Sequence, residues 1–365
     1  MKRRQCVAAG LSLPLWPWAA QAQARQPLQF PRDLGSHPDH AIEWWYITGQ
    51  LQSAQRQFGF QLTFFRSRVP VTQGMTSAFA AKQLIFAHAA VTDVAGKRLL
   101  HDQRIARASG NPQIDLASAS ELDTAVQMGD WSLHRDGSSY LAKARGADFS
   151  FQLTLRETQP LLLQGDQGWS RKGPEAHQAS YYYSLPQLQA SGQLNVGGQT
   201  LPVQGQAWLD HEWSQSLMHP DAVGWDWIGM NLLDGSALTA FRLRTKAGAA
   251  LWAGGSIRSA GASNAEIFGP DDVIFTPQRL WKSPASGTSY PVDWSVQVRR
   301  GLSATREPVV ERYTVKAVID IQELDSRQST GAIYWEGLSA LLDSNGKLVG
   351  SGYLEMTGYA SPLRL

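Results

Sequence analysis

The chain carries two copies of one three-part pattern, and this repeat limits the folds open to it. Each copy begins with an aromatic segment, continues into Leu-Thr-x-Phe-Arg-x-Arg and ends with Gly-x-small-aromatic-Leu-acid. The parts occupy residues 43–49, 62–68 and 205–210 in the first half, and residues 225–231, 238–244 and 350–355 in the second. Segments this rich in aromatic and β-branched residues favour strands. We therefore expect two related β units.

Turn signals separate short apolar segments along the rest of the chain. Asp-Gly, Gly-Gly or similar signals occur at residues 93–96, 136–137, 197–198, 234–235 and 343–346. Short antiparallel strands at this spacing imply β-sandwiches or barrels. We predict an all-β protein whose domains comprise residues 25–216 and 217–365, with the boundary near residues 214–224.

Residues 1–24 have the features of a cleavable export signal. Lys2, Arg3 and Arg4 precede a mostly apolar run, which is followed by small residues at the spacing of a cleavage site. Pro14 and Pro17 interrupt this short run, so we do not expect a permanent transmembrane helix. We predict an exported protein, either periplasmic or secreted. The single cysteine lies inside the signal, so the mature chain is expected to have no disulfide.

Composition argues against nucleic acid as a partner and points to an apolar ligand. The formal net charge is only +2 and both signs are scattered, so there is no basic patch of the kind that nucleic acid requires. The chain has 14 Trp, more than we expect a core of this size to need. Some of these rings should therefore line a cavity, because small barrels enclose a ligand at their mouths.

Four motifs, in chain order, resemble the AttH/CrtC family. They are Glu43-Trp-Trp-Tyr-x-x-Gly49, Ala207-Trp-Leu-Asp-His-Glu-Trp213, Tyr334-Trp-Glu-Gly337 and Gly352-Tyr-x-Glu-x-Thr-Gly-Tyr359. This family, often labelled lipocalin-like or "predicted secreted hydrolase", includes the carotenoid 1,2-hydratases. The resemblance extends from about residue 31 to the end. It implies two lipocalin-like (calycin-type) antiparallel β-barrels packed together, in agreement with the repeat.

The resemblance also implies a reaction on an apolar, isoprenoid-like or lipid-like molecule. We expect acid-catalysed hydration or hydrolysis in an aromatic cavity between the barrels, without a cofactor. The hydratase branch carries an additional acid on the strand corresponding to residues 236–244, where this chain has none, which argues against carotenoid hydration specifically. The alternative is a non-catalytic carrier for a hydrophobic ligand. Transient contact with a membrane surface is left open, and protein partners are not predicted.

The segment Gly205–Trp213 contains the candidate catalytic residues Asp210, His211 and Glu212. In a strand, alternate side chains point to opposite faces, so Asp210 and Glu212 share one face and His211 lies on the other. Asp210 recurs in the second copy as Glu355, whereas His211 and Glu212 have no counterpart there. We therefore interpret the shared acids as structural and the unshared residues as proton donors or relays. A purely structural hydrogen-bond cluster is the alternative.

The aromatic segments that open the two halves are expected to bind the ligand. The candidate substrate-binding residues are Glu43, Trp45, Tyr46, Trp213, Trp225 and Trp227. Aromatic faces stabilise a carbocation of the kind that protonation of an alkene creates. We predict no metal site, because His37, His40 and His211 would have to converge without a compact ligand motif. Nucleophilic catalysis of the lipase type is not expected either, since the chain lacks Gly-x-Ser-x-Gly.

Overall fold

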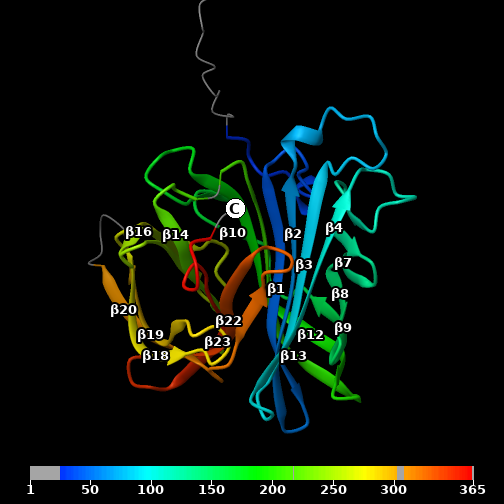
Figure 1. The fold of residues 1–365 in the computed structure, drawn as a ribbon. Coiled ribbons are helices and arrows are strands. Elements are labelled where there is room, and N and C mark those ends of the chain that lie inside the picture. The colour runs from blue at the N-terminus through cyan, green and yellow to red at the C-terminus, as the bar shows by residue number, and fades with distance from the viewer. Residues whose placement is uncertain (1–24, 217, 302–307, 364–365) are drawn as a thin grey trace, which may run out of the picture.

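The computed structural model describes residues 25–216, 218–301 and 308–363 (Figure 1). The predicted export signal, residues 1–24, lies outside the described residues, so export stays a prediction. The described chain forms two antiparallel β-sheets and two short 3-10 helices, η1 (Arg32–Leu34) and η2 (Pro70–Thr72). None of these helices is long and apolar enough to cross a membrane. The predicted all-β class is confirmed.

The first sheet has 13 strands and curls into a nearly closed barrel. Its spatial order is β4-β3-β2-β1-β13-β12-β9-β8-β7-β6-β5, with β10 and β11 also paired to β12. Arg104 on the edge strand β4 donates to Asp130, in the turn between β6 and β7, and to the carbonyl of Arg145 at the end of β8, so it links strands from the two ends of the sheet. The strands are β1 (Ile42–Ser53), β2 (Arg56–Arg68), β3 (Gln83–Asp93), β4 (Arg98–Ala108), β5 (Ala117–Ala119), β6 (Ala125–Met128), β7 (Trp131–Asp136), β8 (Ser139–Arg145), β9 (Phe149–Arg156), β10 (Leu162–Leu163), β11 (Trp169–Arg171), β12 (Ala179–Val196) and β13 (Gln199–Ser214).

The second sheet has 10 strands and shares none with the first. Its spatial order is β17-β16-β15-β14-β23-β22-β20-β19-β18, and β21 pairs with β22. The first sheet ends at Ser214 and the second begins at Ala222, on either side of the linker that contains the expected boundary. The strands are β14 (Ala222–Leu232), β15 (Ala237–Thr245), β16 (Ala250–Arg258), β17 (Glu266–Phe268), β18 (Val273–Lys282), β19 (Ser289–Arg300), β20 (Val309–Ala317), β21 (Glu323–Ser326), β22 (Ala332–Leu342) and β23 (Leu348–Met356).

The sequence repeat is also a repeat of topology. In the first sheet the three marker segments lie on β2, β1 and β13, which are adjacent in that order. In the second they lie on β15, β14 and β23, again adjacent and in the same order. The register of the first two segments agrees as well, since Glu43 pairs with Arg66 and Asp226 pairs with Arg242. The third segment pairs two residues out of step: Asp210 lies opposite Tyr46, whereas its counterpart Glu355 lies opposite Trp227 rather than Gly229. The two copies therefore share strand order and the pairing of their first two segments.

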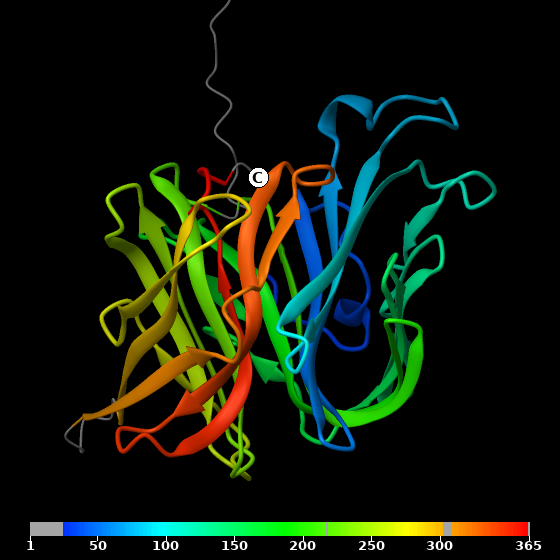
Figure 2. The same ribbon diagram turned by 60° about the horizontal axis from the view of Figure 1, so that its bottom comes forward.

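The strands at the centre of the first sheet are buried on both faces. All residues of β13 from Ala207 to Ser214 are buried, and so is most of β1. Figures 1 and 2 show β22 and β23 of the second sheet lying against the first sheet, where β23 contacts β1 and β22 contacts β2. A strand covered on both faces needs aromatic or apolar side chains at successive positions rather than at alternate ones. This explains why the aromatic segments are so dense.

Three large apolar clusters and a small fourth one, formed by Ala90, Leu324 and Tyr334, hold this arrangement together. One fills the barrel, a second fills the second sheet, and a third lies between the two and includes Trp208, Trp227 and Tyr353. A β-bulge in β12 places Gln187 at a φ of 57°, and its side chain then donates to two carbonyls of the second sheet, those of Leu232 and Ser236. Bulges re-aim side chains in this way. The two sheets are thus docked by apolar packing and by specific hydrogen bonds.

Candidate functional site

A pocket of about 300 Å³ lies between the two sheets. Aromatic and aliphatic side chains form most of its wall, and acidic groups interrupt it. The first sheet and its loops contribute Ile42, Glu43, Trp44, Tyr46, Thr63, Phe65, Arg66, Ser67, Phe86, His88, Lys172, Tyr182, Asp210 and Glu212. The remainder of the chain contributes Met218, Trp225, Trp227, Phe241, Leu243, Ser329, Thr330, Ala332, Ile333, Tyr334, Glu336, Glu355, Thr357, Gly358, Ser361 and Leu363.

Strand register sets the depth of the lining residues. Tyr46 lies opposite Asp210, two residues further along β1 than Trp44, which lies opposite Glu212. In the second sheet Glu355 lies opposite both Trp227 and Glu336. Tyr46, Asp210 and Glu336 are buried, and Glu355 beside them keeps some exposure to the pocket. At the other end of the pocket the lining residues Ile42, Ser67 and Met218 are partly exposed. We call Tyr46, Asp210, Glu336 and Glu355 the pocket floor, and the partly exposed end its mouth.

Asp210 on the floor has an unusually basic carboxyl group. Burial raises its pKa to about 7, although three donors act in the opposite direction. Its Oδ1 accepts from Ser184 Oγ at 2.5 Å and from Trp208 Nε1 at 2.7 Å, and its Oδ2 accepts from the Tyr182 hydroxyl at 2.9 Å. The carboxyl group therefore exchanges its proton near neutral pH, as a general acid must.

Glu355 and Glu336 form a second acidic group, from directly opposed positions on adjacent strands. Burial raises the pKa of Glu355 to about 7, against a hydrogen bond from Trp225 Nε1 to its Oε2 at 2.9 Å. Burial and the neighbouring Glu355 raise the pKa of Glu336 well above its usual range. Like charges this close disfavour simultaneous ionisation. The pair therefore keeps at least one proton at neutral pH.

Two polar atoms on the floor have no hydrogen-bond partner among the described residues. They are the Tyr46 hydroxyl and Glu336 Oε1, on side chains that are 6% and 2% exposed. A weak hydrogen bond from the hydroxyl acts to lower the pKa of the Glu336 carboxyl group, but the two groups do not reach the distance and angles of a normal hydrogen bond. Of the eleven buried side-chain atoms that lack a hydrogen-bond partner among the described residues, these two are the ones whose residues line the pocket.

One wall of the pocket holds a buried cation. Lys172 Nζ lies 3.1 Å from Glu212 Oε1, 4.7 Å from the centre of the Tyr182 ring and 4.3 Å from that of Phe241. Ser180 also donates to Glu212. The carboxylate of Glu212 is therefore already neutralised by protein groups, in contrast to the acids on the floor.

The opposite wall contains a chain of hydrogen bonds that crosses from one sheet to the other. His88 on β3 lies 2.8 Å from the Tyr334 hydroxyl and 2.9 Å from Ser329 Oγ. Burial lowers the pKa of His88 to about 3. Its imidazole is consequently neutral but a weak base, so the Ser329–His88 contact lacks the basicity that would activate a hydroxyl nucleophile.

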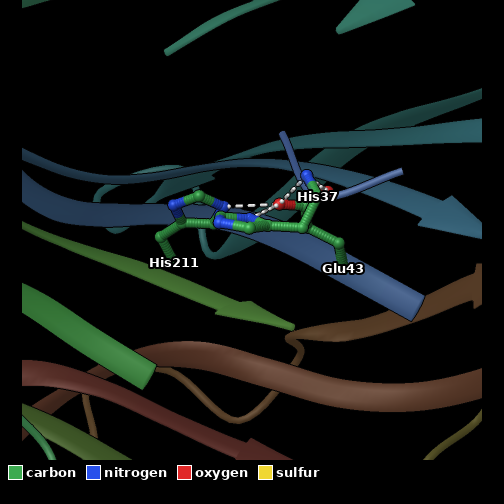
Figure 3. Close-up of side chains that lie close together, drawn as sticks. All are labelled: His37, Glu43 and His211. Carbon is green, nitrogen blue, oxygen red and sulfur yellow. Dashed lines mark hydrogen bonds and ion pairs between the residues drawn. The ribbon is translucent and has the colours of Figure 1, made fainter. Parts of the chain in front are cut away.

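His211 lies on the other face of β13, inside the barrel (Figure 3). Its Nε2 is 2.9 Å from Glu43 Oε1 and its Nδ1 is 3.0 Å from the Tyr183 hydroxyl, while its ring stacks on Trp45 at 4.7 Å. The side chain is 0% exposed, and burial lowers its pKa to about 4. This environment stabilises the neutral imidazole.

Glu43 is the centre of that cluster. Its carboxylate accepts from His37 Nδ1 at 2.7 Å, Arg66 Nε at 2.7 Å and Ser36 Oγ at 2.8 Å, in addition to His211. Burial alone would raise the pKa of Glu43, but the hydrogen bonds from His211 and His37 outweigh it and hold the pKa well below the usual range. Glu43 is therefore a stable buried anion.

The potential ligand atoms of His37, Glu43 and His211 all lie within 4.8 Å of one another. Both imidazoles contact the same oxygen, Glu43 Oε1, at hydrogen-bonding distances of 2.7 and 2.9 Å. Separate metal ligands in a tetrahedral site stand farther apart than this, given metal–ligand bonds of about 2.0–2.2 Å. Arg66 adds a positive charge at the same carboxylate. The donor set fits shared protons better than a metal ion.

The structure divides the predicted site residues between two places. Asp210, Glu212, Tyr46, Trp225 and Trp227 line the pocket, and Glu43 borders it although its carboxylate belongs to the barrel cluster. His211, Trp45 and Trp213 are not in the lining; Trp45 and Trp213 pack in the barrel core, and Trp213 stacks on His37 with ring centres 3.7 Å apart. The catalytic role of His211 stays a prediction.

Sequence reasoning did not select Glu336, Glu355, Lys172 or Tyr182. Glu355 was visible as the counterpart of Asp210 in the repeat, but residues present in both copies were interpreted as structural. The two shared acids instead both line the pocket. Glu336 is part of the Tyr334–Gly337 motif, but nothing in the sequence indicated which residue it would contact. Only strand pairing places it opposite Glu355.

Comparison with known proteins identifies the family of this chain and solved structures that share its fold. The AttH-like family matches residues 21–359. A crystal structure of a candidate AttH protein from Nitrosomonas europaea is 42% identical, with a TM-score of 0.82, over 95% of this chain and all of the other. Kievitone hydratase from Nectria haematococca is similar in fold at 15% identity and a TM-score of 0.67, over 93% of this chain and 94% of its own.

CghA has a related fold at lower similarity. It is 12% identical, with a TM-score of 0.52 over 88% of each chain, and its structure with Sch210972 matches about equally well. At these identities the likeness to kievitone hydratase and CghA concerns the fold alone. No curated protein matches the chain by sequence.

Proposed function

The chain belongs to the AttH-like family, and from that premise we propose that it is an enzyme that adds water to an apolar small molecule in the pocket between its sheets. One observation carries the proposal: three carboxyl groups with raised pKa values, those of Asp210, Glu336 and Glu355, meet at the floor of an otherwise mostly apolar pocket. Such acids hold a proton at neutral pH beside a ligand that water cannot protonate.

In the proposed reaction the Glu336–Glu355 pair supplies both the acid that donates a proton and the carboxylate that takes one back. The protonated carboxyl group gives its proton to one carbon of an alkene, and the other alkene carbon becomes cationic. A water oxygen bonds to that cation, and its extra proton passes to a carboxylate on the floor. The net change is the addition of one water and the enzyme regains its proton. Asp210, at the same depth, is the alternative donor.

The aromatic wall has a defined part in this reaction. Trp44, Trp225 and Trp227 line the pocket, and the Tyr46 and Trp227 rings meet edge to face at 5.4 Å. Aromatic faces attract a cation most strongly where water is excluded. The wall would therefore lower the energy of the carbocation, and an isoprenoid-like or lipid-like alkene would fit its apolar surface.

The likeness to known proteins supports this proposal through the fold. One protein with this fold is named a hydratase, and another has been solved with a bound small molecule. Hydrolysis remains the second reaction class, since the same acids could protonate a leaving group. The Ser329–His88 contact is the one feature of the lining that favours a nucleophilic route, and the low pKa of His88 argues against it.

The test begins with mass spectrometry of apolar molecules that co-purify with the protein. Each is then incubated with fresh protein in heavy-oxygen water, and the product is examined for the mass of one added, labelled water. We expect Glu355→Gln, Glu336→Gln or Asp210→Asn to reduce turnover by about 10²–10⁴, the usual contribution of a general acid. Tyr140→Phe, a buried change in the barrel core, serves as the control.

Two outcomes would contradict the proposal. Release of an unchanged ligand by wild-type protein would identify a carrier instead. A labelled product formed at an undiminished rate by all three acid variants would place the chemistry elsewhere in the molecule.

A further inference from the structure

Some polar groups on the pocket floor have hydrogen-bond partners within the protein and others have none. Asp210 accepts three hydrogen bonds and Glu355 accepts one from Trp225. By contrast, the Tyr46 hydroxyl and Glu336 Oε1 are buried without a partner in the described chain. Leaving a buried polar atom unpaired destabilises the fold, so two such atoms at one place in a pocket indicate a ligand group that pairs with them.

The two unpaired groups have complementary hydrogen-bonding capacity. A tyrosine hydroxyl donates one hydrogen and accepts another, and a protonated carboxyl group donates one as well. They come from different sheets, with Tyr46 on β1 and Glu336 on β22, so a group held by both would bridge the two sheets. A single oxygen atom with two lone pairs could accept from both.

The charges around the floor restrict what that oxygen can belong to. Asp210, Glu336 and Glu355 supply acidic groups only. The two cations that line the pocket are already paired, Lys172 with Glu212 and Arg66 with Glu43. A ligand carboxylate or phosphate would meet these acids without a free cation to balance it. An uncharged hydroxyl or carbonyl group meets no such penalty.

We propose that Tyr46 and Glu336 form a subsite for a hydroxyl or carbonyl group on an otherwise apolar ligand. The inference rests on the proposed function only in using the same pocket, and it specifies the ligand as an apolar alcohol or ketone rather than a hydrocarbon or a fatty acid. The subsite orients the ligand with its oxygen on the floor and its apolar body toward the mouth. Such an orientation brings the carbons nearest that oxygen to Glu355.

The test compares ligands that share one chain length and differ in the end group. Binding of decan-1-ol, decan-2-one, decane and decanoate to the wild-type protein is measured by titration calorimetry. We expect the alcohol and the ketone to bind about 3–10-fold more tightly than decane, the usual net effect of one hydrogen bond, and decanoate to bind most weakly. Equal affinity for the alcohol and decane, or tightest binding of decanoate, would overturn the proposal.

A pair of single-atom variants then locates the effect. Tyr46→Phe should remove most of the preference for the alcohol over decane and leave the affinity for decane unchanged. Tyr140→Phe removes an equally buried and unpaired hydroxyl from the barrel core and should change neither affinity. An unchanged preference in Tyr46→Phe would contradict the assignment. Thermal unfolding of both variants checks that they are folded.

Glu336→Met tests the other residue of the subsite, because it removes the carboxyl group while keeping the approximate length of the side chain. It too should lower the affinity for the alcohol and not that for decane. These binding results are separable from the proposed function. A preference for alcohols without water addition supports the subsite and refutes the catalysis, whereas water addition without that preference refutes the subsite alone.

Discussion

Replacement of Glu355 by Gln should make the protein more stable at high pH while it removes a catalytic acid. The pKa of Glu355 is raised by burial from 4.5 to about 7 in the folded protein. A raised pKa in the folded state contributes stability that is fully present below pH 4.5 and is lost as the pH rises through about 7. The variant has no such group, so the loss affects only the wild-type protein.

The size of the stability difference between variant and wild type follows from the size of the pKa shift of Glu355. Each pH unit corresponds to about 1.4 kcal/mol, so the shift from 4.5 to about 7 amounts to about 3 kcal/mol. Glu355 keeps partial exposure to the pocket, so we expect about 2–3 kcal/mol. The Trp225 Nε1–H can still donate to the Gln carbonyl oxygen, so little stability is lost in exchange.

The assay is urea unfolding of both proteins at a series of pH values between 5 and 8. The free energy of unfolding of Glu355→Gln minus that of the wild type should increase with pH and level off above about 7. Glu175→Gln, at an exposed loop position, is the matched control for removing one carboxyl group. A difference that stays constant for Glu355→Gln, or one that falls as the pH rises, would show that folding does not raise the pKa of Glu355.

Three further predictions concern the barrel cluster and the pH dependence of activity. Glu43→Gln should lower the free energy of unfolding by about 3–5 kcal/mol, because it leaves Arg66 buried beside a neutral group; a loss below about 1 kcal/mol in urea unfolding would contradict this. His211→Gln should cost about 1–2 kcal/mol and leave turnover per folded molecule nearly unchanged, because His211 contacts the barrel cluster rather than the pocket; a fall of about 10²–10⁴ in turnover would instead establish the catalytic role predicted from the sequence. Activity should decrease as the pH rises through about 7, since Asp210 and Glu355 lose their protons there; a kcat/KM profile that rises above pH 7 would argue for a basic catalyst.

Much of the fold followed from the repeat. The three marker segments predicted related β units, and they occupy adjacent strands in both sheets. Alternation along Gly205–Trp213 also placed Asp210 and Glu212 on one face and His211 on the other, as the structure has them. These features are local or periodic, so a single sequence contains them. The predicted domain limits, 25–216 and 217–365, stay a prediction.

The side on which the pocket lies could not be predicted in the same way. β13 is buried on both faces, and only the packing of the second sheet determines that the face of Asp210 meets a cavity while the face of His211 meets the barrel core. Nor does the sequence show that Glu336 lies opposite Glu355, because their strands must first pair in one register. Of the unshared residues that the sequence singled out, Glu212 lines the pocket and His211 and Trp213 do not, while both shared acids line it.

The proposed function requires that carboxyl groups on the pocket floor remain protonated near neutral pH. Infrared difference spectroscopy across a pH titration tests it directly, because a protonated carboxyl group has its own carbonyl band. We predict a band that disappears as the pH rises through about 7, and that is reduced in Glu355→Gln and again in Asp210→Asn. Complete ionisation of all carboxyl groups by pH 5, or a band that both variants leave unchanged, would contradict the account.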